Sequence, residues 1–101
     1  MLENLKVKNL GNISRYGFLR DNEFRCYRKF IDNNYDFNSE NYYSVITIYD
    51  IGKVSIHYCS TLSYATWDNL AIYNDSQNSV YEKTQHIIEK LIKDDVLQEI
   101  K

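Results

Sequence analysis

Residues 42–60 constrain the fold most, because β-branched and aromatic side chains fill two runs on either side of a short polar turn. The first run is Tyr-Tyr-Ser-Val-Ile-Thr-Ile-Tyr and the second is Val-Ser-Ile-His-Tyr-Cys-Ser. Residues 50–53, with the sequence Asp-Ile-Gly-Lys, stand between them. Such side chains favour the pleated surface of a strand, and a short connection with Asp and Gly is typical of a hairpin. The sequence therefore predicts an antiparallel hairpin over residues 42–60.

The second run of this hairpin divides its side chains into two sets. Neighbouring side chains of a strand point to opposite faces, so one face carries Val54, Ile56 and Tyr58. The opposite face carries Ser55, His57 and Cys59. We expect the first face to be the buried one, because it is the more apolar of the two.

Residues 16–31 predict a further hairpin, with strands over 16–20 and 23–31 joined at Asp21 and Asn22. In that arrangement one face of the second strand holds Phe24, Cys26 and Phe30, and the other holds Arg25, Tyr27 and Lys29. A helix with Phe24, Tyr27 and Ile31 on one stripe fits the same segment. We favour the strand, because aromatic side chains prefer a pleated surface.

The C-terminal segment predicts an amphipathic helix. The residues that recur at helical spacing are Val80, Thr84, Ile87, Ile88, Leu91 and Ile92. Ser79 stands three residues before Glu82, as in a capping box, and this spacing predicts the start of the helix. Asp94 and Asp95 oppose the helix dipole, so we expect a break there, with Asp94 or Asp95 capping a last turn through Val96, Leu97 and Ile100. Residues 61–75 fit a strand or a short helix, and we favour a strand followed by a loop.

These segments together predict an α+β fold, in which an antiparallel β-meander of three to five strands packs against a C-terminal α-helix. A chain of 101 residues is close to the commonest domain size, so we expect a single domain over residues 1–101. No apolar run approaches the roughly 20 residues that cross a bilayer, so we expect no membrane-spanning segment.

Cysteine usage and charge bear on the compartment and on the partners. Cys26 and Cys59 are too few for a disulfide framework, and the first residues lack the basic and then apolar run of a signal peptide. We therefore expect a reduced, cytoplasmic protein. The net charge is −2 overall, but residues 1–30 carry +4 and residues 31–80 carry −5. We expect these two blocks to pair with each other across a sheet, and two oppositely charged faces are the alternative.

No motif in the sequence indicates catalysis or a cofactor. His57 and Cys59 are two residues apart on a predicted strand, which separates them by roughly 6.5 to 7 Å, too far for a direct hydrogen bond between thiol and imidazole. The sequence has no C-x-x-C or H-x-x-x-H pair of the kind that typifies zinc sites, and no G-x-S-x-G signature. We therefore expect no cofactor, no metal and no enzymatic activity.

An acidic and aromatic segment predicts a protein-binding site. Residues 32–41 are rich in Asn and Asp and predict a long loop. Carboxylates beside aromatic rings bind basic protein surfaces through opposite charge and ring contacts. The predicted partner-binding residues are Asp32, Tyr35, Asp36, Phe37 and Glu40 in the loop, with Tyr42, Tyr43 and Tyr49 in the adjoining strand.

The leading hypothesis is a small non-enzymatic binding protein that masks or inhibits a partner protein, in the way that immunity proteins, antitoxins and phage-encoded inhibitors of host enzymes act. One alternative is a nucleic-acid-binding module, whose cations contact phosphates while aromatic rings stack on bases. Its residues would be Arg25, Tyr27, Arg28 and Lys29. A second alternative is a structural subunit that self-associates through an unprotected strand edge and forms a homodimer.

Overall fold

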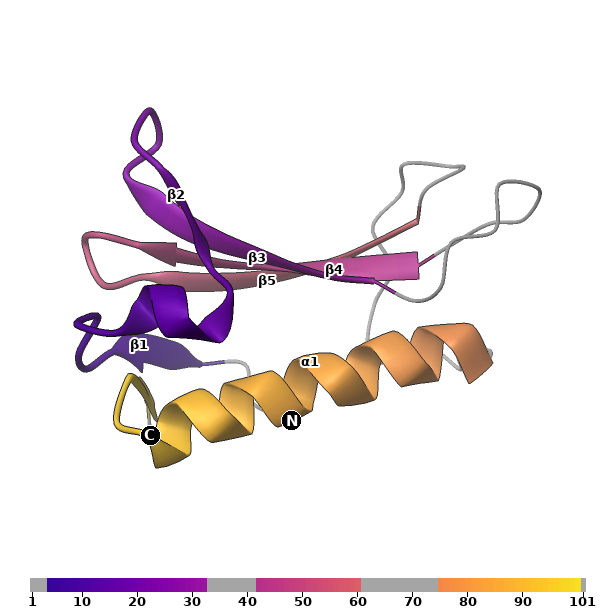
Figure 1. The fold of residues 1–101 in the computed structure, drawn as a ribbon. Helices are drawn as coiled ribbons and strands as arrows, with labels where there is room; N and C mark the ends of the chain where they lie inside the picture. Colours follow the sequence, from indigo (N-terminus) through magenta and orange to yellow (C-terminus); the bar gives the residue numbers. More distant parts are fainter. Residues whose placement is uncertain (1–3, 33–41, 61–74, 101) are drawn as a thin grey trace.

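The computed structural model describes residues 4–32, 42–60 and 75–100. In these residues an antiparallel sheet of four strands has one long helix on one of its faces, which confirms the predicted α+β class (Figure 1). The sheet has the strand order β2-β3-β4-β5, and a separate two-stranded sheet joins β1 to β6. The strands are β1 (Leu5–Val7), β2 (Leu19–Asp21), β3 (Cys26–Asp32), β4 (Tyr42–Tyr49), β5 (Val54–Ser60) and β6 (Leu97–Glu99), and the helices are the 3-10 helix η1 (Ile13–Tyr16) and α1 (Asp75–Lys93).

The hairpin predicted over residues 42–60 is confirmed. Strands β4 and β5 run antiparallel, with Tyr42 opposite Ser60 and Ile48 opposite Val54. Gly52 has a φ of 99°, a backbone conformation that side-chain-bearing residues rarely adopt, and so it allows the tight turn between the strands.

Alternation along β4 and β5 decides which side chains form the core. Ile46 and Ile48 of β4 are completely buried on the face that α1 covers. Val54 and Ile56 of β5 lie opposite residues of that set and pack against the same core. His57 points to the other face and is exposed. The prediction that the face of this strand with Val54, Ile56 and Tyr58 packs against the core is therefore confirmed.

Helix α1 packs the predicted stripe against the sheet. Val80, Thr84, Ile88 and Leu91 are all completely buried, at the spacing of one helical face. The hydroxyl of Thr84 donates to the Val80 carbonyl oxygen at 2.7 Å and accepts from the Ser44 hydroxyl of β4 at 2.6 Å. This hydrogen-bonded pair satisfies two buried hydroxyl groups at the helix–sheet interface.

The ends of α1 differ from those predicted. The helix begins at Asp75, about one turn before the predicted cap at Ser79. Asp75 was also the last residue of the segment predicted as strand and loop, and the rest of that segment, residues 61–74, lies outside the described residues.

The chain turns at Asp95, where φ is 61°, shortly after the helix ends at Lys93. Beyond this turn Leu97 is buried in β6, directly opposite Val7 of β1. The predicted last helical turn through Val96, Leu97 and Ile100 is therefore wrong. Pairing with a strand from the other end of the chain satisfies the backbone of this segment and buries Leu97, and the local sequence gives no sign of that partner.

The predicted hairpin around residue 21 is confirmed over its central part. Strands β2 and β3 pair with Leu19 opposite Arg28, so the strand rather than the helix forms here. Tyr16 belongs to η1 instead of the first strand, and Gly17 ends that helix with a φ of 84°. The face of β3 that meets α1 carries Tyr27, Lys29 and Ile31, because these residues stand opposite the core residues of β4.

Candidate partner-binding surface

The face of the four-stranded sheet that points away from α1 is the candidate functional surface. Figure 1 shows α1, η1 and β1 on the same side of this sheet. We call the opposite side the outer face. It carries every second side chain of the three long strands, counted from Cys26 in β3, Tyr43 in β4 and Ser55 in β5.

One row of side chains crosses the outer face from β3 to β5. The strand register places Phe30 directly opposite Val45, and Val45 directly opposite His57. Phe30 is 59% exposed, and its ring lies 6.3 Å from that of Tyr43 between centroids, tilted by 36°. We call Phe30, Tyr43, Val45 and His57 the aromatic row. This row places a large exposed ring on a rigid, hydrogen-bonded sheet.

At the end of the outer face next to the turn between β2 and β3, Arg28 is held by an ion pair and by an aromatic ring. The Asp21 carboxylate accepts the backbone N–H groups of Glu23 and Phe24, at 3.0 and 3.1 Å, and pairs with Arg28. The backbone N–H of Phe24 and the guanidinium of Arg28 lower the pKa of Asp21 below its ordinary value. Arg28 in turn lies over the Phe24 ring, 5.4 Å from its centroid. The positive charge of Arg28 is therefore balanced within the protein.

A second ion pair joins the basic and acidic blocks of the sequence. Arg20 donates to both oxygens of Asp50 at 2.6 and 2.8 Å, and it lies over the Tyr27 ring, 4.8 Å from the centroid. The hydrogen bonds from Arg20 lower the pKa of Asp50. This pair provides one contact of the expected kind between residues 1–30 and residues 31–80.

The predicted partner-binding residues are divided between the two faces of β4. Tyr43 and Tyr49 belong to the outer face, whereas Tyr42 belongs to the helix-facing side of the strand. Asp32 is the last residue of β3. The remaining residues of the predicted site, Tyr35, Asp36, Phe37 and Glu40, lie outside the described residues.

The residues of the alternative nucleic-acid site do not form one surface. Arg25 lies in the turn before β3 with a φ of 51°. Tyr27 and Lys29 face α1, while Arg28 belongs to the outer face and is paired with Asp21. Phe30, Val45 and His57 were not among the predicted site residues, because an aromatic or β-branched residue in a strand fits a buried face equally well.

The described residues hold no group of three or more His, Cys, Asp and Glu side chains arranged for a metal ion. Cys26 and Cys59 are not joined in a disulfide. Among the described residues, no helix has the length and apolar content needed to cross a bilayer. A scan against protein-family models matched no family, and searches of curated proteins and of solved structures found no match.

Proposed function

We propose that this protein is a small non-enzymatic binding protein that masks a partner protein, such as an enzyme or a toxin. The observation that supports the proposal is the aromatic row on the outer face. Phe30 exposes more than half of its surface although it lies in the middle of a strand, and Tyr43 packs beside it. Immunity proteins, antitoxins and phage-encoded inhibitors are the classes that act by such masking.

The chemistry of the outer face suits a protein surface. Aromatic side chains are enriched at the centres of protein interfaces, where they bury a large area and lose little conformational freedom. Each square ångström of apolar surface removed from water contributes about 25 cal/mol, so covering Phe30 and Val45 favours association. The strands hold these side chains in place before the partner arrives, which lowers the entropic cost of binding.

A protein partner fits better than nucleic acid. Binding to nucleic acid depends on cations that are free to contact phosphates. In the alternative nucleic-acid site Arg28 already pairs with Asp21, whereas Tyr27 and Lys29 lie on the opposite face of β3 from Arg28, and the whole chain carries a net charge of −2. We include the acidic residues of the segment before β4 in the proposal, where they would contact a basic part of the partner. The proposal also includes a cytoplasmic site of action, where cysteines such as Cys26 and Cys59 would stay reduced.

Affinity capture tests the proposal. The tagged protein is incubated with lysate of its native source, with and without nuclease, and the retained proteins are identified by mass spectrometry. A single protein retained after nuclease treatment is the expected result. Recovery that disappears with nuclease would contradict the proposal and favour nucleic acid as the ligand.

Two matched substitutions then locate the surface. Val45→Lys places a charge in the aromatic row, and Ile51→Lys places the same charge at the β4–β5 turn, where Ile51 is 88% exposed. We expect Val45→Lys to abolish capture of the identified partner and Ile51→Lys to retain it. Tyr35→Ala and Asp36→Lys test the acidic segment in the same assay, and unchanged capture would remove those two residues from the proposal.

A further inference from the structure

Strand β3 leaves part of its backbone open at an edge of the sheet. Strand β2 pairs only with Cys26–Arg28, whereas β4 pairs with β3 along its whole length. The part of β3 that follows Arg28 therefore has a neighbouring strand on one side alone among the described residues. An open strand edge is where an extended segment of another chain can add by hydrogen bonding.

The hydrogen-bond pattern shows which residue presents its backbone at this edge. The backbone N–H of Asp50 donates to the Arg25 carbonyl oxygen at 3.0 Å, so Arg25 points its backbone groups toward β4. In an antiparallel ladder every second residue does the same, and Lys29 and Ile31 therefore also point toward β4. Phe30 lies between them and points its N–H and its carbonyl oxygen away. Among the described residues, neither group has a partner on that side.

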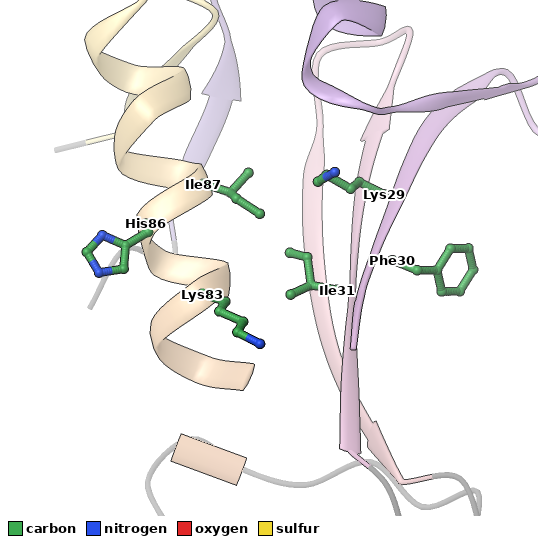
Figure 2. A pocket seen from close by; sticks show the side chains of 6 residues that line it. All are labelled: Lys29, Phe30, Ile31, Lys83, His86 and Ile87. Carbon is green, nitrogen blue, oxygen red and sulfur yellow. The ribbon is translucent and has the colours of Figure 1, made fainter. Parts of the chain in front are cut away.

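A shallow cavity of about 380 Å³, largely open to solvent, lies beside this edge, between β3 and α1. The residues that line it are Lys29, Phe30, Ile31, Lys83, His86 and Ile87. Figure 2 shows Lys29 and Ile31 pointing from β3 toward α1, with Lys83 and Ile87 pointing back toward the strand. Phe30 and His86 point away from this space. The interior of the cavity thus combines two ammonium groups with two branched apolar side chains.

Neither lysine of the cavity forms an ion pair with a carboxylate of the described residues. The lysines that do form such pairs, Lys8 and Lys90, lie elsewhere in the fold. Lys29 Nζ lies against Gly17, where an added Cβ would come within 2.6 Å of it. Within residues 4–32, 42–60 and 75–100, the open strand edge is therefore bordered by two lysines that no carboxylate pairs, and this positive charge complements an acidic segment.

We propose that this edge of β3 binds an extended segment of the partner protein as an added strand, with an acidic residue facing Lys29 and Lys83. The proposal rests on the proposed function and names the part of the partner that docks. Two backbone hydrogen bonds join the segment to Phe30. The residue opposite Phe30 lies on the outer face, beside the aromatic row, and its two neighbours point into the cavity. One neighbour is acidic, and the other is apolar and contacts Ile31 and Ile87.

A labelled synthetic peptide tests this geometry directly. The probe is Thr-Thr-Glu-Tyr-Val-Thr-Thr, and its matched control has Lys in place of Glu. We expect the Glu peptide to bind and to slow hydrogen exchange of the Phe30 amide, measured by NMR on the unmodified protein. The Lys peptide should do neither. Unchanged exchange at Phe30 in the presence of saturating Glu peptide would overturn the proposal.

Two pairs of variants separate the charge from the backbone contact. Lys83→Glu should weaken binding of the Glu peptide by about tenfold, because an attraction becomes a repulsion, whereas Lys93→Glu on the same helix lies outside the cavity and should leave it unchanged. Phe30→Pro removes the N–H that points out of the edge, and Phe30→Ala removes only the ring. We expect Phe30→Pro to bind more weakly than Phe30→Ala, and equal binding by the two would contradict the added strand.

The same variants distinguish this proposal from the proposed function. If the captured partner is lost with Val45→Lys but retained with Lys83→Glu and Phe30→Pro, the masking function stands and the added strand is wrong. If lysate yields no protein partner while the peptide results hold, the edge binds acidic segments and the masking function is wrong. A homodimer that protects the Phe30 amide would place a second copy at the edge and overturn the proposal.

Discussion

The two faces of the four-stranded sheet are built from the same strands, yet their side chains differ in burial. On the helix-facing side Ile46 and Ile48 are completely buried and the hydroxyl of Ser44 bonds to α1. On the outer face Val45 and His57 retain contact with solvent, and Phe30 is largely exposed. Neighbouring residues of one strand can therefore contribute separately to folding and to recognition, because a strand directs alternate side chains to opposite sides.

The largest expected difference between the faces is in stability. Ile46→Ala should lower the free energy of unfolding by about 2 to 5 kcal/mol, because it leaves a cavity in the core. Val45→Ala, one residue away on the outer face, should cost about 1 kcal/mol or less. Denaturant unfolding of both variants measures the contrast. Equal losses would mean that the outer face is as tightly packed as the core.

The hydroxyl pair between the sheet and the helix provides the next test. Thr84→Val should cost about 1 to 3 kcal/mol, because the Ser44 hydroxyl loses its buried partner. Adding Ser44→Ala to this variant should recover part of the loss, since neither hydroxyl then remains buried. A double-mutant cycle from unfolding curves measures the coupling. Strictly additive losses would show that the two hydroxyls do not depend on each other.

Gly17, which lies against Lys29 of β3, can be compared with Gly52, which lies in the turn between β4 and β5. Gly17→Ala and Gly52→Ala should each cost about 1 to 2 kcal/mol, because both residues have positive φ. Only the alanine at position 17 would meet another group, the amino group of Lys29. We therefore expect Gly17→Ala alone to alter binding of the Glu peptide, and the two variants can be compared by thermal unfolding and peptide titration. Equal peptide binding by both variants would show that Lys29 does not contribute to the binding site.

The smallest expected effects depend on pH. Asp21 and Asp50 have pKa values below their ordinary values, through the backbone N–H of Phe24 with Arg28 and through Arg20 respectively. Their stabilisation is fully present above the unfolded pKa of about 3.9 and is lost as the pH falls through the folded pKa. The thermal midpoint should therefore decrease below about pH 4, and Asp50→Asn should reduce that decrease. If the thermal midpoint of Asp50→Asn decreases as steeply with falling pH as that of the unmodified protein, the pair of Arg20 and Asp50 is not the cause of the decrease.

At high pH, Tyr16 should make stability depend on pH with the opposite sign. Its hydroxyl donates to Asp94 at 2.7 Å, and this hydrogen bond to a carboxylate raises the pKa of Tyr16. A group whose pKa is raised on folding stabilises the fold below its unfolded value, about 10 for tyrosine, and loses that contribution as the pH rises further. Tyr16→Phe should therefore weaken the alkaline decrease in the thermal midpoint. The same decrease in both proteins would rule out this hydrogen bond as its source.

The hairpins and the helix stripe were predictable because their signals are local. Alternation in residues 42–60 and the recurrence of Val80, Thr84, Ile88 and Leu91 depend only on the periods of strands and helices. The pairing of β1 with β6 was not predictable, because two short strands from opposite ends of the chain carry no pattern that names a partner. Because the pairing of β1 with β6 was not predicted, the segment around Leu97 was wrongly predicted as a helical turn.

The candidate site was predictable only in part. Tyr43 and Tyr49 were selected for their residue type, and the register places both on the outer face. Tyr42 has the same residue type, but its position in the strand places it on the helix-facing side. Lys29 and Lys83 lie far apart in sequence and line one cavity only because α1 packs beside β3. Such a pair follows from tertiary structure and from no local motif.

The most direct test of the account uses the two histidines of the chain. His57 belongs to the outer face and His86 to the exposed side of α1, so each reports on a different surface. Acylation by diethyl pyrocarbonate, quantified by mass spectrometry with and without the captured partner, measures the accessibility of both in one experiment. Masking through the outer face predicts that the partner protects His57. Unchanged reactivity of His57 in the complex would contradict it.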